Sequence, residues 1–359
     1  MVRMKLFVTV AFWTVLPLLP LLLWQIPASG HKGRGDAVQG QIIALSGAVP
    51  GSGLGNHQSV RLGRDLYAER SPKFADRKEM MDFKGYSRAY VLHLPPSYVG
   101  SSGVPLVVCL HGGGGDMNFA IKMTGLNAKA DSEGFAVVYP NGTGRLRRHF
   151  LTWNAFDCCG WARGKQIDDV GFIRALLARL EGELKIDAQR IYLVGFSNGA
   201  MMSYRLASEL SDKFAAFAAV AGSMSGKERE PDNPVSALII HGRQDRHVPY
   251  DGGTGKLAKW GFPVNPRPVS YAVDFWVKAD CCSPVPLVRQ EGSVTCKTYS
   301  GGKDGCEVRL YAIEGARHAW PGGKRAWLLA DCPSQALGAT DRCWEFFARH
   351  SKSSSQGRR

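Results

Sequence analysis

The sequence predicts an α/β fold, with a mainly parallel central sheet and helices on both of its faces. Short apolar runs of strand length recur along the chain, and segments with helical periodicity separate them. This alternation is typical of parallel sheets, because parallel neighbours need a crossover connection that is usually a helix. A chain of 359 residues, 45% of them hydrophobic, can bury both faces of such a sheet. The predicted strands span residues 90–94, 106–110, 135–139, 191–196, 216–221, 237–240 and 308–313.

Residues 1–30 have the features of an export signal. Arg3 and Lys5 precede an apolar stretch over residues 6–24, and small residues follow it. This order of basic, apolar and small residues is typical of a signal peptide. An uncleaved anchor is the alternative, since a membrane span needs about 20 residues, but two prolines interrupt the stretch. We expect a secreted or periplasmic protein rather than a membrane-anchored one.

Three further segments follow. Residues 31–84 are rich in glycine, serine and charge, which predicts an extended low-complexity lead segment. Residues 85–350 contain all the predicted strands and should form the catalytic α/β domain. Residues 351–359 are polar and should form a tail.

The clearest helical pattern spans residues 168–184. Ile173, Leu177 and Leu180 fall on one face of this segment, as in an amphipathic helix. Asp168 and Asp169 stand at its start. Helix capping accounts for these two aspartates as well as a catalytic role does.

A glycine loop, His111-Gly112-Gly113-Gly114-Gly115, follows the strand at 106–110. Glycines let backbone N–H groups approach a substrate oxygen closely, because no Cβ atom intervenes. A phosphate-binding loop is the competing interpretation, but it needs a Gly-Lys-Ser/Thr sequence or a spaced glycine motif with a later acidic residue. The loop contains neither lysine nor a hydroxyl residue. We therefore expect it to form an oxyanion hole, with Gly113 as the donor.

The segment Gly195-Phe196-Ser197-Asn198-Gly199 lies between the strand at 191–196 and a helix-like segment at 200–210. Its Gly-x-Ser-x-Gly pattern, in this context, predicts a sharp turn that exposes a nucleophilic serine. The backbone N–H of Asn198, at the start of the helix, would be a second oxyanion donor. A glycine-rich turn with a solvated serine has the same pattern, so the prediction depends on partners elsewhere in the chain.

Two such partners follow later strands. Asp245 lies in the loop after the strand at 237–240, and His318 lies in the loop after the strand at 308–313. The order Ser197, Asp245, His318 is the order that a serine hydrolase on an α/β sheet requires. His241 and His247 stand on either side of the presumed acid, in the wrong place for this order, and we interpret both as structural.

The nine cysteines indicate an oxidising compartment. Cys109 lies in a predicted central strand and should be a buried free thiol. The other eight lie in presumed loops or near the C-terminus, where disulfide bonds are expected. Zinc binding is the alternative, but the adjacent pairs 158–159 and 281–282 lack the Cys-x-x-Cys spacing with which two thiolates bind one zinc ion. We expect no metal site.

The net charge of +14 raises the question of nucleic-acid binding. The basic residues are scattered, without a recognition helix or interleaved aromatic residues. We expect no nucleic-acid partner and infer no obligatory protein partner. A basic exported protein would instead be attracted to acidic wall or polysaccharide surfaces.

From about Tyr86 to His350 the chain resembles the polyhydroxybutyrate depolymerase family of secreted esterases, which is related to feruloyl and acetylxylan esterases and has the α/β-hydrolase fold. The resemblance implies that Ser197 is the nucleophile, Asp245 the acid and His318 the base. Extra cysteines at positions 109, 281, 296, 332 and 343 depart from the family pattern. The matching segments are 90–98, 111–116, 138–142, 153–154, 158–160, 168–172, 195–200, 245, 248–250, 318–322 and 344–347.

Together the motifs and the resemblance predict an exported serine carboxylesterase that works through an acyl-enzyme without a cofactor. Its substrate would be a small ester, a polyester oligomer of the polyhydroxyalkanoate class or an esterified plant polysaccharide. Trp320 and Trp153 are candidates for the substrate pocket, although a core tryptophan is an equally good interpretation of Trp320. Two alternatives stay open: a peptidase of the same fold, and a catalytically silent, membrane-tethered binding protein.

Overall fold

The computed structural model describes residues 76–352, apart from 147–148, 256–264 and 326–329. The contacts within the chain divide it into two units, Met1–Tyr67 and Ala68–Arg359, and the following concerns the second. The predicted signal peptide and most of the predicted lead segment lie outside the described residues, as do the last seven residues of the predicted tail.

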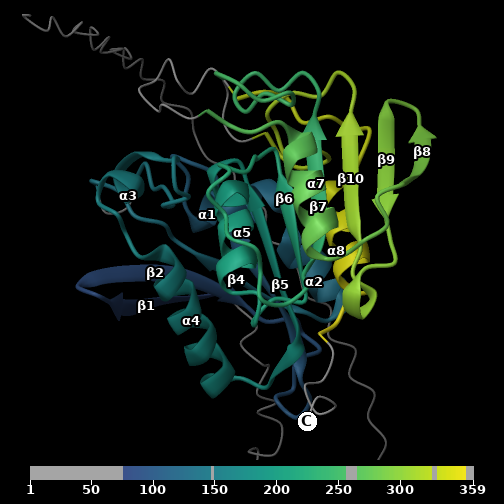
Figure 1. Ribbon diagram of the computed structural model, residues 1–359. Coiled ribbons are helices and arrows are strands. Elements are labelled where there is room, and N and C mark those ends of the chain that lie inside the picture. The colour runs from purple at the N-terminus through teal and green to yellow at the C-terminus, as the bar shows by residue number, and fades with distance from the viewer. Residues whose placement is uncertain (1–75, 147–148, 256–264, 326–329, 353–359) are drawn as a thin grey trace, which may run out of the picture. The chain divides into compact units, whose positions relative to one another are not determined.

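One sheet of ten strands forms the centre of the domain (Figure 1). Six neighbouring strands, in the order β4, β3, β5, β6, β7 and β10, run parallel. Antiparallel strands extend both edges, β2 and β1 next to β4, and β9 and β8 next to β10. The strands are β1 Arg77–Phe83, β2 Tyr86–His93, β3 Val104–Leu110, β4 Ala136–Pro140, β5 Ile186–Phe196, β6 Ala216–Val220, β7 Ser236–Gly242, β8 Leu287–Glu291, β9 Val294–Tyr299 and β10 Val308–Ile313.

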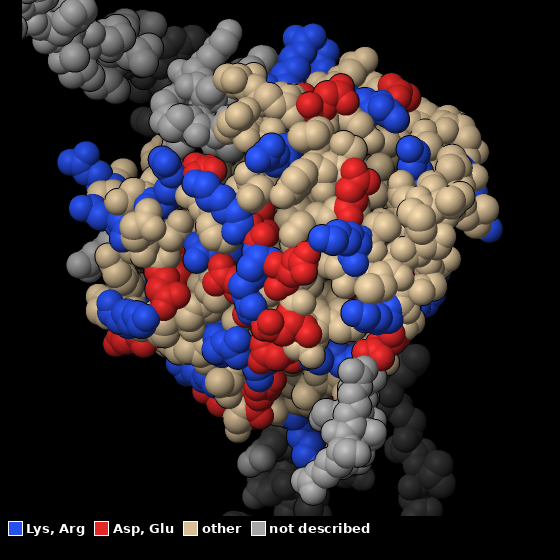
Figure 2. Space-filling model, in the orientation of Figure 1, with Lys and Arg blue, Asp and Glu red and all other residues tan. Residues whose placement is uncertain are grey.

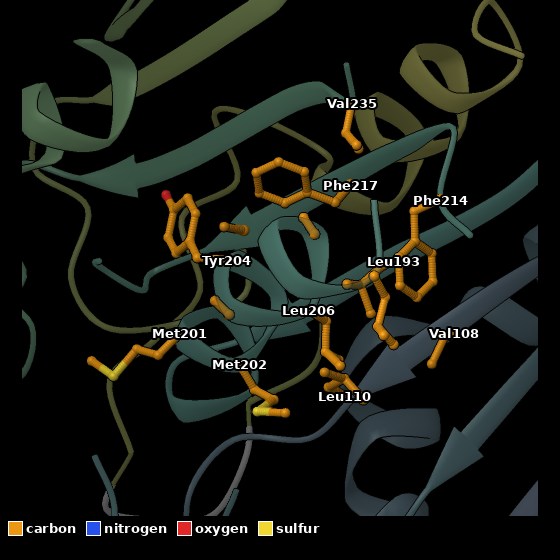
Figure 3. Close-up of a cluster of buried hydrophobic side chains, with 14 of the residues drawn as sticks. Val108, Leu110, Leu193, Met201, Met202, Tyr204, Leu206, Phe214, Phe217 and Val235 are labelled. Carbon is orange, nitrogen blue, oxygen red and sulfur yellow. The ribbon is translucent and has the colours of Figure 1, made fainter. Parts of the chain in front are cut away.

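Helices cover both faces of the sheet, and successive residues of β3 show the division. Leu106 and Val108 pack in one apolar cluster with α4, α5 and α7, part of which Figure 3 shows. Val107 and Cys109 pack in a second cluster with α1, α2 and α8. Within the described ranges no helix is both long and apolar enough to cross a membrane. The helices are α1 Met117–Thr124, α2 Leu126–Glu133, α3 Gly160–Gly164, α4 Asp169–Glu183, α5 Asn198–Glu209, α7 Val269–Ala279, α8 Ala339–Phe347 and the 3₁₀ turn η1 Lys303–Gly305.

The predicted fold class is confirmed, and each of the seven predicted strands is present. The predicted helix at 168–184 is α4, whose N-cap Asp168 accepts a hydrogen bond from the N–H of Gly171 at 2.8 Å. The sequence analysis missed three strands: the edge strands β1 and β8, and β9, which pairs with β8. Because β1 lies within residues 31–84, the sheet begins before the end of the predicted lead segment. Every residue of β8 is exposed and no residue of β1 is fully buried, so neither has the apolar pattern of an inner strand.

Charges of both signs are mixed on the face that Figure 2 shows. Ion pairs at the molecular surface join charges of opposite sign. Arg179 of α4 contacts Glu79 at 3.1 Å and Glu183 at 2.7 Å, and Arg174 contacts Asp212 at 3.0 Å. The positive net charge is therefore not gathered into a single basic patch on this face.

The cysteines differ from the expectation. The one disulfide bond within the described residues joins the neighbours Cys158 and Cys159, and the other seven cysteines are free. Cys109 is buried and free, as predicted. Several bridges between loop cysteines were expected, and this structure does not contain them. Cys282 and Cys306 are both buried, and the Sγ atom of Cys282 lies 3.6 Å from the carbonyl oxygen of Cys306.

Candidate active site

Ser197 occupies a sharp turn between β5 and α5. Its φ of 54° and ψ of −118° are strained for a residue with a side chain. The flanking glycines make the turn possible, because a Cβ atom on Gly195 would overlap the carbonyl of Gly199, and one on Gly199 would overlap the carbonyls of Leu110 and His111. The N–H of Ser197 donates to the carbonyl of Val220 at 2.9 Å. The elbow is thus held against both neighbouring strands of β5.

The three predicted residues Ser197, Asp245 and His318 come together in one hydrogen-bonded line. His318 Nε2 lies 2.9 Å from Ser197 Oγ, and His318 Nδ1 lies 2.7 Å from Asp245 Oδ2. The loops meet because β5, β7 and β10 are parallel and end at the same edge of the sheet. This arrangement of strands brings His318 next to Ser197, 121 residues earlier in the chain, and next to Asp245, 73 residues earlier.

The carboxylate of Asp245 is buried and fully bonded. Its Oδ1 atom accepts the backbone N–H groups of His247 at 2.8 Å and Val248 at 2.9 Å, while Oδ2 faces His318. Burial acts to raise the pKa of Asp245, but the attraction of His318 and His241 outweighs it and holds the pKa far below its usual range. Asp245 is therefore a fixed negative charge beside the imidazole.

His241 and His247 lie next to Asp245 and His318. His241 is buried, and its Nε2 atom donates to the carbonyl of Val248 at 2.9 Å. The ring of His247 stacks on that of His318 with a centroid distance of 5.0 Å. Both placements agree with the structural interpretation of these histidines.

His111 sets the orientation of the glycine loop. Its Nε2 atom accepts the N–H of Gly142 at 2.9 Å, so the ring proton is on Nδ1, which donates to the carbonyl of Gly112 at 2.8 Å. Burial lowers the pKa of His111 to about 4, so the ring is neutral at pH 7. The N–H of Gly115 donates to the same carbonyl at 3.1 Å. Because a trans peptide holds N–H and C=O on opposite sides, the N–H of Gly113 points away from His111.

Gly113 and Asn198, the two predicted oxyanion donors, adjoin each other. A Cβ atom built on Gly113 would lie 3.5 Å from that of Asn198. The side chain of Asn198 is directed elsewhere: it accepts the N–H of Trp153 at 2.7 Å and donates to the carbonyl of Trp153 at 3.1 Å. The amide side chain of Asn198 is therefore already engaged, and the backbone N–H groups of Gly113 and Asn198 stay the predicted oxyanion donors.

Neither predicted pocket tryptophan borders an open site. Trp153 is fully buried, and its indole N–H donates to the carbonyl of His111 at 3.0 Å. Trp320 is 1% exposed, and its indole N–H donates to Thr340 Oγ1 at 3.0 Å. Their positions favour packing roles behind the site over contact with substrate.

A buried ion pair that the sequence analysis missed lies behind the site. Arg88 on β2 contacts Asp169 on α4 at 2.8 Å, and both side chains are almost fully buried. The other oxygen of Asp169 accepts the N–H of Asn154 at 2.8 Å, and Arg88 donates to the carbonyl of Asn141 at 2.9 Å. Asp169 therefore supports the Trp153 segment and is no surface cap. The adjacent aspartates at 168–169 were noted in the sequence, but nothing in the sequence identified Arg88 as the partner of Asp169.

Comparisons with known proteins agree with this geometry. The family model described as "Esterase PHB depolymerase" matches residues 88–252. "Putative esterase NocK" of Nocardia uniformis subsp. tsuyamanensis is 32% identical over 273 residues, which cover 72% of this chain and 76% of that protein. "Feruloyl esterase B" of Piromyces equi is 28% identical over 67% of this chain, and the match spans 44% of that longer protein.

Solved structures show the same fold. The acetyl xylan esterase from Aspergillus awamori superimposes with a TM-score of 0.53 at 14% identity, over 76% of this chain and 99% of that one. A thermostable esterase superimposes with a TM-score of 0.50 at 16% identity, over 77% and 63% of the two chains. The chain is an ester hydrolase with the α/β-hydrolase fold and belongs to the PHB depolymerase family of esterases.

Proposed function

We propose that the protein is an exported serine carboxylesterase in which Ser197 is the nucleophile, His318 the general base and Asp245 the acid. The supporting observation is the continuous hydrogen-bonded line of 2.9 Å and 2.7 Å that joins the three side chains. Ser197 is 7% exposed, so little of its surface is open to solvent. A serine needs such an adjacent base, because its own hydroxyl is a weak nucleophile at neutral pH.

In the proposed mechanism Ser197 Oγ attacks the ester carbonyl carbon while His318 Nε2 takes the hydroxyl proton. The N–H groups of Gly113 and Asn198 hold the oxyanion of the tetrahedral intermediate. His318 then gives its proton to the departing alcohol, which leaves an acyl group on Ser197. Water attacks this acyl-enzyme with His318 again as the base, and the carboxylic acid leaves. Asp245 holds the imidazole tautomer and stabilises its charged form.

The names of the relatives bear on the substrate. They include feruloyl and acetylxylan esterases, so we propose that esterified polysaccharides, polyester oligomers or small esters of the same kinds are hydrolysed. The comparisons favour this over a peptidase of the same fold. Export through residues 1–30 remains part of the proposal, since that segment lies outside the described residues.

A fluorophosphonate probe tests the mechanism directly, because it phosphonylates only an activated serine. We expect stoichiometric labelling and loss of activity, with the added mass on the peptide that contains Ser197 after digestion. Ser197→Ala should not be labelled, and His318→Gln should be labelled far more slowly. Labelling of a different serine, or of the Ser197→Ala protein, would contradict the proposal.

A further inference from the structure

The side chain of Phe196 contacts two parts of the site that the proposed mechanism uses separately. Phe196 is the last residue of β5 and directly precedes Ser197. It is 6% exposed, and it packs in the apolar cluster that includes α1, α2 and α8. The mechanism above gives this side chain no role, but its contacts with Gly112 and His318 indicate one.

The ring of Phe196 lies against the ring of His318. The two ring centroids are 5.0 Å apart, and the ring planes are inclined at 37°. Tilted aromatic rings with centroids about 4.5–7 Å apart attract each other. The hydrogen bonds of an imidazole lie in its ring plane, so contacts on the ring faces resist a tilt of that plane. The ring of His247 also stacks on His318, whereas the ring of Phe196 reaches the glycine loop as well.

The contact of the Phe196 ring with the glycine loop is at Gly112. A Cβ atom added to Gly112 would lie 2.9 Å from Cδ1 and 3.4 Å from Cε1 of Phe196. The peptide group that follows Gly112 carries the N–H of Gly113, the predicted oxyanion donor. The Phe196 ring therefore limits how closely this peptide can approach the imidazole of His318.

The backbone conformation at Gly112 does not itself require glycine. Gly114 of the same loop has a φ of 81°, in the left-handed region, but Gly112 is not among the residues with a positive φ. The atoms nearest to a Cβ at Gly112 all belong to Phe196, and the closest of them is on its ring. The lack of a side chain at this position thus allows the ring to pack against the loop.

We propose that Phe196 is a positioning residue that couples the oxyanion loop to His318. The inference rests on the proposed function, since it needs His318 to be the base and Gly113 to be an oxyanion donor. A change that pushes the ring away from Gly112 would also tilt the imidazole relative to Ser197 Oγ. Because a misplacement of about 1 Å can cost a hundredfold in rate, the coupling should be visible in kcat.

Phe196→Leu tests the contact with His318. Leucine keeps an apolar side chain but not the flat ring that lies against the imidazole. We expect kcat for p-nitrophenyl butyrate to fall about tenfold or more, with a much smaller change in KM. Phe217→Leu is the matched control, because Phe217 is a buried phenylalanine of the neighbouring strand β6 that packs on Trp276, in the other apolar cluster (Figure 3). It should lower the urea midpoint and leave kcat nearly unchanged.

Gly112→Ala tests the contact with the loop, in the wild-type protein and in Phe196→Ala. In the wild-type protein we expect kcat to fall about tenfold or more, because the new methyl group displaces the ring. In Phe196→Ala the same substitution should cost almost nothing, since the ring atoms that the methyl group would meet are gone. Should Phe196→Ala fail to fold, Phe196→Val, which also has no δ atoms, replaces it.

Gly115→Ala is the matched control for the loop. A Cβ atom on Gly115 would lie 2.8 Å from the ring of Phe119, so its effect on kcat should be the same with and without the Phe196 ring. An unchanged kcat in Phe196→Leu, or an effect of Gly112→Ala that is the same with and without the ring, would overturn the inference. Hydrolysis by Ser197→Ala at the wild-type rate would instead overturn the proposed function, whatever Phe196 does.

Discussion

The side chain of Asn198 brackets the backbone of Trp153, accepting its N–H at 2.7 Å and donating to its carbonyl at 3.1 Å. This contact joins the residue after Ser197 to a loop 45 residues earlier in the chain. The next residue of that loop, Asn154, donates its N–H to Asp169, which is in turn paired with Arg88. The elbow therefore rests on a buried polar network that reaches Arg88 on β2, the neighbour of the edge strand β1.

Asn198→Ala should lower both stability and activity while it leaves the backbone N–H in place. The buried N–H of Trp153 would lose its partner, at about 1–3 kcal/mol, whereas the carbonyl of Trp153 keeps the N–H groups of Ala155 and Cys159 at 3.1 Å. We expect a lower urea midpoint and a loss in kcat that exceeds any rise in KM, because loop position matters most in the transition state. Asn198→Asp retains the acceptor for the Trp153 N–H but loses the donor. Its urea midpoint and its kcat should fall between those of the wild-type protein and those of Asn198→Ala. An unchanged urea midpoint in Asn198→Ala would contradict this role.

Ser197→Ala and His318→Gln should each lower kcat to about a thousandth of its value or less. The two substitutions remove parts of one unit, so the double variant should be scarcely slower than either single one. His247→Gln is the control, since the ring of His247 stacks on that of His318 and lies outside the predicted set of Ser197, Asp245 and His318. Steady-state kinetics on p-nitrophenyl butyrate measures all four proteins. If the His247 variant were as slow as the His318 variant, the assignment of the base would be wrong.

Arg88→Met should destabilise the protein more than removal of a surface ion pair does. Asp169, whose pKa burial already raises, would lose the charged partner that opposes this effect, and breaking one partner of a buried pair costs about 3–5 kcal/mol. Arg174→Met is the matched control, because Arg174 pairs with Asp212 at the exposed surface, where such a pair contributes about 0–1 kcal/mol. Urea unfolding compares the two. An equal fall in the free energy of unfolding for Arg88→Met and Arg174→Met would contradict a larger stabilising role for the Arg88–Asp169 pair.

The sequence was sufficient to predict the three residues of the line because each follows a strand, and parallel strands that end at one edge bring their loops together. The buried ion pair that lies behind these three residues could not be predicted in this way. Arg88 and Asp169 are 81 residues apart, and nothing local to either indicates the partner. Burial favours packing roles for Trp153 and Trp320, whereas the sequence could not separate the two interpretations, since an aromatic residue beside a motif can either line a pocket or pack behind it.

Two buried groups far from each other give opposite pH dependences of stability. Asp280 is fully buried with one oxygen bonded to the N–H of Val235 at 3.0 Å and the other unpartnered among the described residues. Burial raises the pKa of Asp280 to about 7, despite the opposing effects of that N–H and of Lys303. Burial lowers the pKa of His111 to about 4. In an unfolded chain the two pKa values would be about 3.9 and 6.5.

For Asp280 the folded state binds the extra proton between about pH 4 and pH 7, so its contribution to the free energy of unfolding falls as pH rises through this range. For His111 the unfolded state binds the extra proton between about pH 4 and pH 6.5, so its contribution rises with pH. The two terms, about 4 and 3 kcal/mol at 1.36 kcal/mol per pKa unit, oppose each other in the wild-type protein. Asp280→Asn should therefore gain stability relative to wild type as pH rises from about 4 to 7, and His111→Asn should lose it. Urea titrations across this range measure both differences. A difference that stays flat with pH for either variant would show that its group titrates alike in the folded and unfolded chains.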